Sequence, residues 1–273
     1  MRIERTMAVS ETAKEYQNFV FDLYGTLVDI HTDEEKRLVW EKMCLFYGYH
    51  GAVYTADEMR ESYVRLVREQ ERQIRFDIQM DGHGSGRKAR CSHEAFPEVQ
   101  LEIIFSELFK EKGVEADAAL VLHAGQFFRA LSTEYIRLYQ GVPEMLQALR
   151  RMGKRMYLLT NAQRVFTEYE LKFLDIARYF DGILISSDYG VKKPDVRFFE
   201  CLLNQYHLEP DTCIMIGNDG TSDVAGAKTV GMDTFYLHSN LSPQETGVKA
   251  TYVQDEMNIE LLCRRLGIDI TVA

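Results

Sequence analysis

The hydrophobic pattern along this chain of 273 residues divides it into regions of different period. Residues 18–21 form a short apolar run that ends in Asp22 and a Tyr24-Gly25-Thr26 segment, which predicts a buried strand opening into a turn. From about residue 32 to about residue 139, apolar positions recur at helical spacing. That stretch predicts four amphipathic helices without an intervening strand, a pattern typical of a helical bundle.

Two helix starts in this stretch carry a recognisable polar signal. Thr32 with Glu35, and Thr55 with Glu58, have the T-x-x-E spacing of a capping box. In such a box the two side chains hydrogen-bond to backbone N–H groups that the first helical turn leaves unpaired. We therefore expect the first two helices to begin at these positions.

After residue 141 the pattern alternates between helices and short apolar strands. Strands are predicted at 155–160, 183–186, 213–217 and 234–237, with helices at about 143–152, 165–174, 195–206 and 222–230. Buried strands that alternate with helices indicate a parallel sheet covered on both faces. Since the strand at residues 18–21 adds to this sheet, the helical stretch is an insertion. The predicted fold is α/β, a doubly wound, Rossmann-like parallel sheet core (residues 1–31 and 140–273) with an inserted all-helical domain (residues 32–139).

Composition and charge narrow the classes of partner. With 46% hydrophobic and 27% charged residues the chain is typical of soluble globular proteins, and its net charge of −10 disfavours nucleic acid as a general partner. Its apolar runs are shorter than the roughly 18–20 residues that cross a bilayer, and the N-terminus lacks an apolar stretch of signal-peptide length. We expect a cytoplasmic protein, monomeric or homodimeric, that acts on a small and anionic molecule rather than on a membrane.

Polar side chains follow the predicted strands at their carboxyl ends. They are Asp22 and Tyr24, Thr160 and Asn161, Ser187 and Asp188, and Gly217-Asn218-Asp219. Each group alone is typical of a turn. Because ligands of doubly wound sheets bind outside the carboxyl ends of the strands, four such groups at one edge predict a functional site there.

These segments resemble the four motifs of the haloacid dehalogenase (HAD) superfamily, in that family's order. Residues 21–27 (FDLYGTL) resemble the first motif, Thr160-Asn161 the second, Lys193-Pro194 the third, and residues 217–227 (GNDGTSDVAGA) the fourth. The inserted helices match the position and character of the family's C1 cap domain. The resemblance covers the chain from about residue 16 to its end.

The resemblance implies a hydrolase with an aspartate nucleophile. Asp22 would attack an electrophilic phosphorus or carbon and form a covalent intermediate that water hydrolyses. Thr160 and Lys193 would hold the anionic oxygens of the substrate, one through a hydroxyl and the other through its charge. Asn161 would either hydrogen-bond near the nucleophile or close a turn.

Magnesium is the cofactor that the resemblance implies for a phosphatase. A phosphoryl group and the Asp22 carboxylate repel each other unless a cation lies between them. The residues implied around the metal are Asp22, the backbone carbonyl of Tyr24, Asn218, Asp219 and Asp223. Asn218 stands where the family has an acidic ligand, so either the affinity for magnesium is reduced or Asp219 takes part.

Tyr24 is the second departure from the phosphatase pattern. Phosphatases of the family carry an aspartate there, which protonates the leaving oxygen, whereas haloacid dehalogenases carry tyrosine and release a halide that needs no proton. Phe199, six residues after Lys193, and the acidic Asp219 and Asp223 favour the phosphatase. A magnesium-dependent phosphatase of a small phosphorylated metabolite is the leading prediction. A 2-haloacid dehalogenase and a non-catalytic binding scaffold are the alternatives.

Two segments of the inserted region carry charge without a motif. Arg65, Arg68, Arg72 and Arg75 have helical spacing and are expected to form a solvated face paired with nearby glutamates. Residues 81–90, rich in glycine and basic residues, are expected to form a flexible connector.

Overall fold

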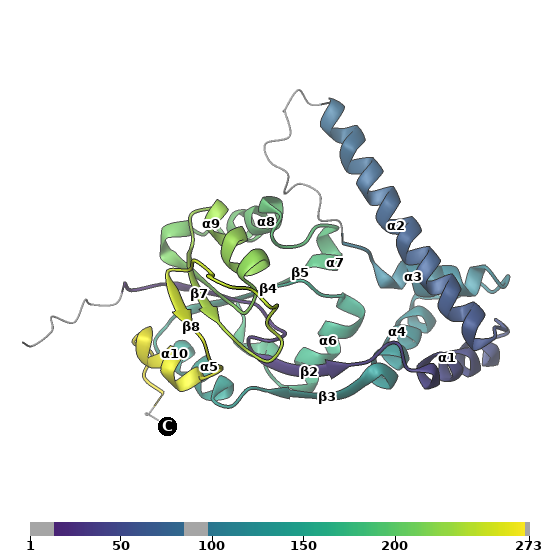
Figure 1. The fold of residues 1–273 in the computed structure, drawn as a ribbon, viewed down its shortest axis with the longest axis horizontal. Coiled ribbons are helices and arrows are strands. Elements are labelled where there is room, and N and C mark those ends of the chain that lie inside the picture. Colours follow the sequence, from purple (N-terminus) through teal and green to yellow (C-terminus); the bar gives the residue numbers. More distant parts are fainter. Residues whose placement is uncertain (1–13, 85–97, 271–273) are drawn as a thin grey trace, which may run out of the picture.

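A computed structural model describes residues 14–84 and 98–270 (Figure 1). Six parallel strands form the central sheet in the order β5-β4-β1-β6-β7-β8. The strands are β1 (Asn18–Phe21), β4 (Arg155–Thr160), β5 (Gly182–Ile185), β6 (Cys213–Gly217), β7 (Asp233–Leu237) and β8 (Tyr252–Gln254). β1 lies at the centre, where Phe21 pairs in register with Leu158 of β4 and Ile216 of β6. The predicted fold class is confirmed.

Helices cover both faces of this sheet, as Figure 1 shows for α5 and α10 on one side and α8 and α9 on the other. The reason is the alternation along β1: Phe19 and Phe21 pack in one buried cluster with the first pair of helices, and Val20 packs in another with the second pair. The helices and helical turns of this part are α5 (Val142–Arg151), α6 (Arg164–Phe173), η1 (Ala177–Tyr179), α7 (Ser186–Tyr189), α8 (Val196–Tyr206), η2 (Pro210–Thr212), η3 (Gly220–Ala225, a π-helix), α9 (Gly226–Thr229) and α10 (Ile259–Arg265).

The four predicted helices of the insertion are present and share a core of their own. They are α1 (Arg37–Tyr49), α2 (Ala56–Gly84), α3 (Leu101–Lys110) and α4 (Ala118–Ser132). The rings of Trp40, Tyr63, Phe105 and Phe128 meet in this core at centroid distances of 5.2 to 6.2 Å. The predicted capping box of α2 is confirmed, since Glu58 N–H donates to Thr55 Oγ1 at 3.2 Å and Thr55 N–H donates to Glu58 Oε2 at 3.3 Å.

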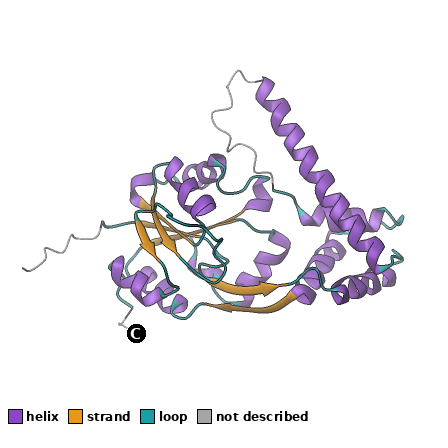
Figure 2. Ribbon diagram, in the orientation of Figure 1, coloured by secondary structure: helices purple, strands orange, loops and turns teal. Residues whose placement is uncertain are grey.

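The prediction for both ends of the helical stretch is wrong. A two-stranded antiparallel ribbon, β2 (Val28–Thr32) with β3 (Thr133–Leu138), carries the chain into and out of the insertion (Figure 2). Thr32 therefore lies in a strand, and α1 begins at Arg37 without a side-chain cap. The run Thr133–Leu138 (TEYIRL), assigned to the last helix, contains β-branched and aromatic residues that pair well across a ribbon, and this pairing overrides the helical spacing.

The other expectations for this region are met in part. Residues 81–84, expected in a connector, continue helix α2, and residues 85–90 lie outside the described residues. Among the helices of residues 14–84 and 98–270, none combines the length and apolarity needed to cross a membrane.

Candidate active site

The carboxyl ends of the central strands border a cavity of about 180 Å³. Asp22 follows β1, Asn161 follows β4, and Asn218 follows β6. The sheet thus brings together segments that are far apart in the sequence. The lining residues are Asp22, Tyr24, Asn161, Lys193, Asn218, Asp219, Ser222, Asp223, Leu241 and Pro243.

Lys193 is the central charge of this cavity. Its Nζ lies 2.7 Å from Asp22 Oδ1 and 2.6 Å from Asp223 Oδ1, and its side chain is 1% exposed. Burial by itself lowers the pKa of Lys193, but the two carboxylates outweigh it and hold that pKa above its usual value. Burial also raises the pKa of Asp223, although the Lys193 ammonium opposes the rise. One ammonium thus faces two carboxyl groups, and the raised pKa of Asp223 reflects the cost of a second negative charge in this buried site.

Asn161 holds Lys193 through the backbone. Its Nδ2 donates to the Lys193 carbonyl at 2.9 Å, and its Oδ1 accepts from the Lys193 N–H at 2.8 Å. The amide therefore ties the end of β4 to the loop that carries the lysine. Of the two roles left open by the sequence, the geometry matches hydrogen bonding close to Asp22, through the backbone of Lys193.

Thr160 contributes an unpaired hydroxyl. It is the last residue of β4, it is fully buried, and its Oγ1 has no hydrogen-bond partner within the described part of the chain. Buried hydroxyls are nearly always paired in folded proteins. The hydroxyl is buried at the end of β4, and Thr160 is not among the residues that line the cavity.

Two glycines let the polar side chains approach each other closely. Gly25 has φ +84°, and a Cβ there would lie 2.2 Å from Asn218 Nδ2, so only glycine fits beside this amide. At Gly217 a Cβ would lie 2.2 Å from Asp223 Oδ2. The motif glycines therefore make room for Asn218 and Asp223 at the sheet edge.

Asp219 has a local hydrogen-bonding role. Its Oδ1 accepts from the N–H groups of Thr221 at 2.8 Å and Ser222 at 2.7 Å, and so caps η3. Asp223 Oδ2 accepts from the Asp219 N–H at 3.0 Å. These bonds fix the fourth motif. The side chain of Asn218 is held separately, since its Oδ1 accepts a hydrogen bond from Thr26 Oγ1 at 3.4 Å.

The phenol of Tyr24 is tied to helix α6. Its hydroxyl lies 3.0 Å from Thr167 Oγ1 and donates a short hydrogen bond to Glu170 Oε2. Burial raises the pKa of Tyr24 well above its usual value, and the Glu170 carboxylate adds to this rise. The phenol therefore keeps its proton and directs it to Glu170.

Arg129, from helix α4 of the insertion, completes this cluster. Its Nε donates to Glu170 Oε1 at 2.6 Å, and its guanidinium lies 5.7 Å from the ring centroid of Tyr24 and 5.0 Å from that of Phe166. The Arg129 and Glu170 side chains are only 16% and 10% exposed. Nothing in the sequence marks Arg129, Thr167 or Glu170 as part of the site, because none of them belongs to a motif, and Thr167 and Glu170 are polar residues on the buried face of α6.

The Arg129–Glu170 pair is predicted to be a large contribution to stability. Arg129→Met leaves a mostly buried carboxylate without its cation and should lower the free energy of unfolding by about 3 kcal/mol. Adding Glu170→Gln removes the stranded charge and should recover part of that loss. Urea denaturation of the three proteins measures both effects.

Arg164→Met is the matched control, because the Arg164 side chain is 44% exposed in its ion pair with Asp188. Loss of such an exposed pair should lower the free energy of unfolding by less than about 1 kcal/mol. A double variant no more stable than Arg129→Met alone would contradict the stranded-charge explanation.

The chain is similar in sequence to known hydrolases. The profile of haloacid dehalogenase-like hydrolases matches residues 16–231. Phosphoserine phosphatase from Thermus thermophilus is 31% identical over 144 residues, which make up 53% of this chain and 57% of that protein. Glyceraldehyde 3-phosphate phosphatase from Pyrococcus abyssi is 32% identical over 103 residues, 38% of this chain and 43% of that protein. The chain spans about half the length of these curated relatives.

A likeness of fold extends over nearly all of the chain. The structure of a 2-haloacid dehalogenase from Pseudomonas syringae pv. Tomato DC3000 superposes with a TM-score of 0.60 at 17% identity, covering 92% of this chain and 98% of that one. The matched profile includes β1 and Asp22 after it, the inserted helices, Thr160 at the end of β4, the loop that carries Lys193, and η3 with Asp223. The resemblance of the four motifs is thereby confirmed: the chain belongs to the haloacid dehalogenase-like hydrolase family.

Proposed function

We propose that this protein is a magnesium-dependent phosphatase that hydrolyses a small phosphorylated metabolite with Asp22 as the nucleophile. The observation that carries the proposal is the buried Lys193 ammonium, 2.7 Å from Asp22 in a cavity at the strand ends. The ammonium fixes the position of this carboxylate at the strand ends, as a nucleophile requires. The relatives that are named as phosphatases support the same reaction class.

The reaction follows from the residues around this cavity. An Asp22 carboxylate oxygen attacks phosphorus while the bond from phosphorus to the leaving oxygen breaks, and the leaving group departs with the electron pair. Water then hydrolyses the aspartyl phosphate, which restores Asp22 and releases inorganic phosphate. The unpaired Thr160 hydroxyl and the Lys193 ammonium hold phosphoryl oxygens. Asn161 keeps Lys193 in place through its two backbone hydrogen bonds.

The residues present fit a magnesium ion. Two carboxylates face one ammonium, so a further cation would balance the charge, and carboxylate, amide and backbone oxygens are the donors that magnesium prefers. Asp22, Asn218 and the carbonyl of Tyr24 would hold the ion. Asp219 is engaged as a helix cap, and Asp223 binds Lys193. Within residues 14–84 and 98–270, no group of three acidic, histidine or cysteine side chains forms a metal site, in keeping with a ligand set that includes an amide. When bound, magnesium offsets the repulsion between the carboxylate and the phosphoryl group.

The second candidate, a 2-haloacid dehalogenase, is favoured by one observation. Tyr24 donates its proton to Glu170 and has a raised pKa, so it does not protonate a leaving oxygen. A halide needs no such proton. Against this candidate stands the second buried carboxyl group, Asp223, which lies beside Asp22 and Lys193 and makes a further cation favourable there.

Asp22→Asn is expected to abolish turnover with every substrate, because an amide does not form the covalent intermediate. The measurement is a panel of phosphate esters and 2-haloacids, assayed for phosphate and halide release with and without magnesium. Circular dichroism and thermal unfolding of the variant are the controls for folding.

Halide release by the wild-type protein without metal would replace the phosphatase proposal by the dehalogenase. Release of neither phosphate nor halide from any compound of the panel would favour a non-catalytic binding scaffold. A variant as active as the wild type, with deamidation excluded by mass spectrometry, would show that Asp22 is not the nucleophile.

Asn218→Asp is expected to tighten magnesium binding, because a carboxylate attracts a hard cation more strongly than an amide does. The same change should destabilise the metal-free protein, since it adds a charge close to Asp22 and Asp223. Calorimetric titration with magnesium and thermal unfolding with and without the ion measure the two effects. An equal magnesium affinity in both proteins would place the ion elsewhere.

The rate should depend steeply on the leaving group, because Tyr24 does not supply a proton to it. Phenolic and acyl phosphates should be hydrolysed faster than alkyl phosphates by a factor of about 10²–10⁴, the usual contribution of general acid catalysis. Tyr24→Asp should narrow this gap. Values of kcat/KM for a series of aryl and alkyl phosphates on both proteins test this. Equal rates across the wild-type series, with chemistry limiting, would mean that another group donates the proton.

A further inference from the structure

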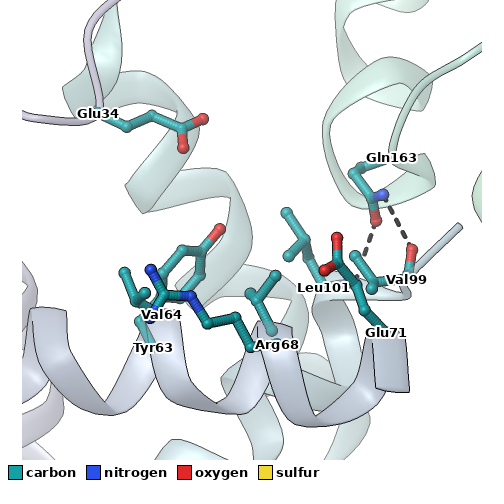
Figure 3. Close-up of a pocket in the computed structure, with 9 residues that line it drawn as sticks. Glu34, Tyr63, Val64, Arg68, Glu71, Val99, Leu101 and Gln163 are labelled. Atoms are coloured by element: carbon teal, nitrogen blue, oxygen red, sulfur yellow. Dashed lines mark hydrogen bonds between the residues drawn. The ribbon is translucent and has the colours of Figure 1, made fainter. Parts of the chain in front are cut away.

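A second cavity, of about 440 Å³, lies between the inserted helices and the core (Figure 3). Its walls come from helix α2, from the segment that leads into α3, from the loop before α1, and from Gln163, which precedes α6. This volume is within the range of small-molecule sites. The lining residues are Glu34, Tyr63, Val64, Val67, Arg68, Glu71, Val99, Leu101 and Gln163.

Tyr63 presents an unpaired hydroxyl to this cavity. Its ring is 9% exposed and packs against Trp40 and Phe128, at centroid distances of 5.2 and 5.5 Å. No residue in the described ranges hydrogen-bonds to the hydroxyl, and Figure 3 shows it directed into the cavity, towards Glu34. The ring is thus held by the core of the insertion while its polar end is open to a ligand.

Glu34 faces Tyr63 from the opposite wall (Figure 3). Its side chain is half-buried, and within the parts of the chain that the structure covers it takes part in neither a hydrogen bond nor an ion pair. Burial raises the pKa of Glu34, while the charge of Arg129 lowers it. A carboxylate that is partly removed from water and lacks a direct partner is best satisfied by a cationic ligand.

Arg68 supplies a cation beside these two groups. The sequence predicted that the arginines of α2 pair with neighbouring glutamates, and Arg65 does so with Glu69 and Glu111. Arg68 has no such partner among the described residues, and it lines the same cavity as Tyr63 (Figure 3). The prediction of a paired face is therefore met at Arg65 and not at Arg68.

The two cavities meet the chain two residues apart, because Asn161 lines the smaller one and Gln163 lines the larger one. The charge of Arg129 acts on Glu34, which lines the larger cavity, and on Tyr24, which lines the smaller one. Gln163 connects them from the core side. It lies two residues after Asn161, accepts from the Leu101 N–H at 3.0 Å, and donates to the Val99 carbonyl at 2.9 Å. The larger cavity therefore adjoins the edge of the sheet at which Asp22 lies.

We propose that the larger cavity binds the leaving group of the substrate, and that this group carries both an ammonium and a carboxylate, as in a phosphorylated amino acid. This inference rests on the proposed phosphatase function and names its substrate class. The ammonium of the leaving group donates to the Glu34 carboxylate and to the Tyr63 hydroxyl oxygen. The Arg68 guanidinium donates to the carboxylate of the leaving group. A wholly apolar leaving group would leave these three polar groups unpaired.

The test measures competitive inhibition of 4-nitrophenyl phosphate hydrolysis, so that it does not depend on how fast an alkyl phosphate turns over. Four inhibitors vary the two charges: O-phosphoserine has both, O-phosphoethanolamine has the ammonium, 3-phosphoglycerate has the carboxylate, and ethyl phosphate has neither. O-phosphoserine should inhibit at a concentration at least about tenfold lower than ethyl phosphate, because a charge-assisted hydrogen bond is worth roughly that factor. The two compounds with a single charge should fall between them.

Two variants assign the charges to residues. Glu34→Gln should weaken inhibition by the two ammonium compounds and leave that by ethyl phosphate unchanged, while Arg68→Met should do the same for the two carboxylate compounds. Arg72→Met is the matched control: it removes an arginine one turn further along α2 that does not line this cavity, and it should change none of the four values.

Equal inhibition by all four compounds, or a variant that weakens all four alike, would overturn the proposal. If 4-nitrophenyl phosphate is not hydrolysed at all, it is the phosphatase proposal that fails. The order of affinities of the same four compounds, measured by calorimetry on the wild-type protein with magnesium, then decides separately whether the cavity selects for the two charges.

Discussion

The contact between Lys193 and two carboxylates organises the site. The ammonium lies 2.7 Å from Asp22 and 2.6 Å from Asp223 with almost no exposure to solvent. Charges so far from water are tolerated only when they are paired and hydrogen-bonded. Asn161 holds the backbone of Lys193, and Asp223 also accepts from the Asp219 N–H, so the loops after β4, β5 and β6 have to meet around this one cation.

A second buried pair connects the inserted helices to the same site. Arg129 belongs to α4, Glu170 to α6, and the phenol that donates to Glu170 belongs to the turn that carries Asp22. The position of the insertion and the orientation of Tyr24 therefore depend on each other. This coupling explains how Tyr24 is accommodated beside Asp22: its hydroxyl donates to Glu170, which does not line the smaller cavity, while Tyr24 itself does.

Local sequence patterns were sufficient for most of the core. Strands such as Arg155–Thr160 and Cys213–Gly217 were predicted to the residue, because a buried parallel strand reads as a continuous apolar run. The pattern failed at residues 133–138, where helical spacing and strand propensity competed. That competition was decided by pairing with residues 28–32, about a hundred positions away, which a local pattern does not contain.

The sequence by itself determined the α/β core, the inserted helices and the motif residues that the sheet brings to one edge. Tertiary structure alone decided the partners of those residues. Asn161 hydrogen-bonds to the backbone of Lys193, Asp219 caps η3 through Oδ1 and also lines the cavity, and no motif in the sequence contains Arg129 or Glu170. The physical reason is that periodicity records which face of an element is buried, whereas a hydrogen bond or ion pair depends on the placement of two elements relative to each other.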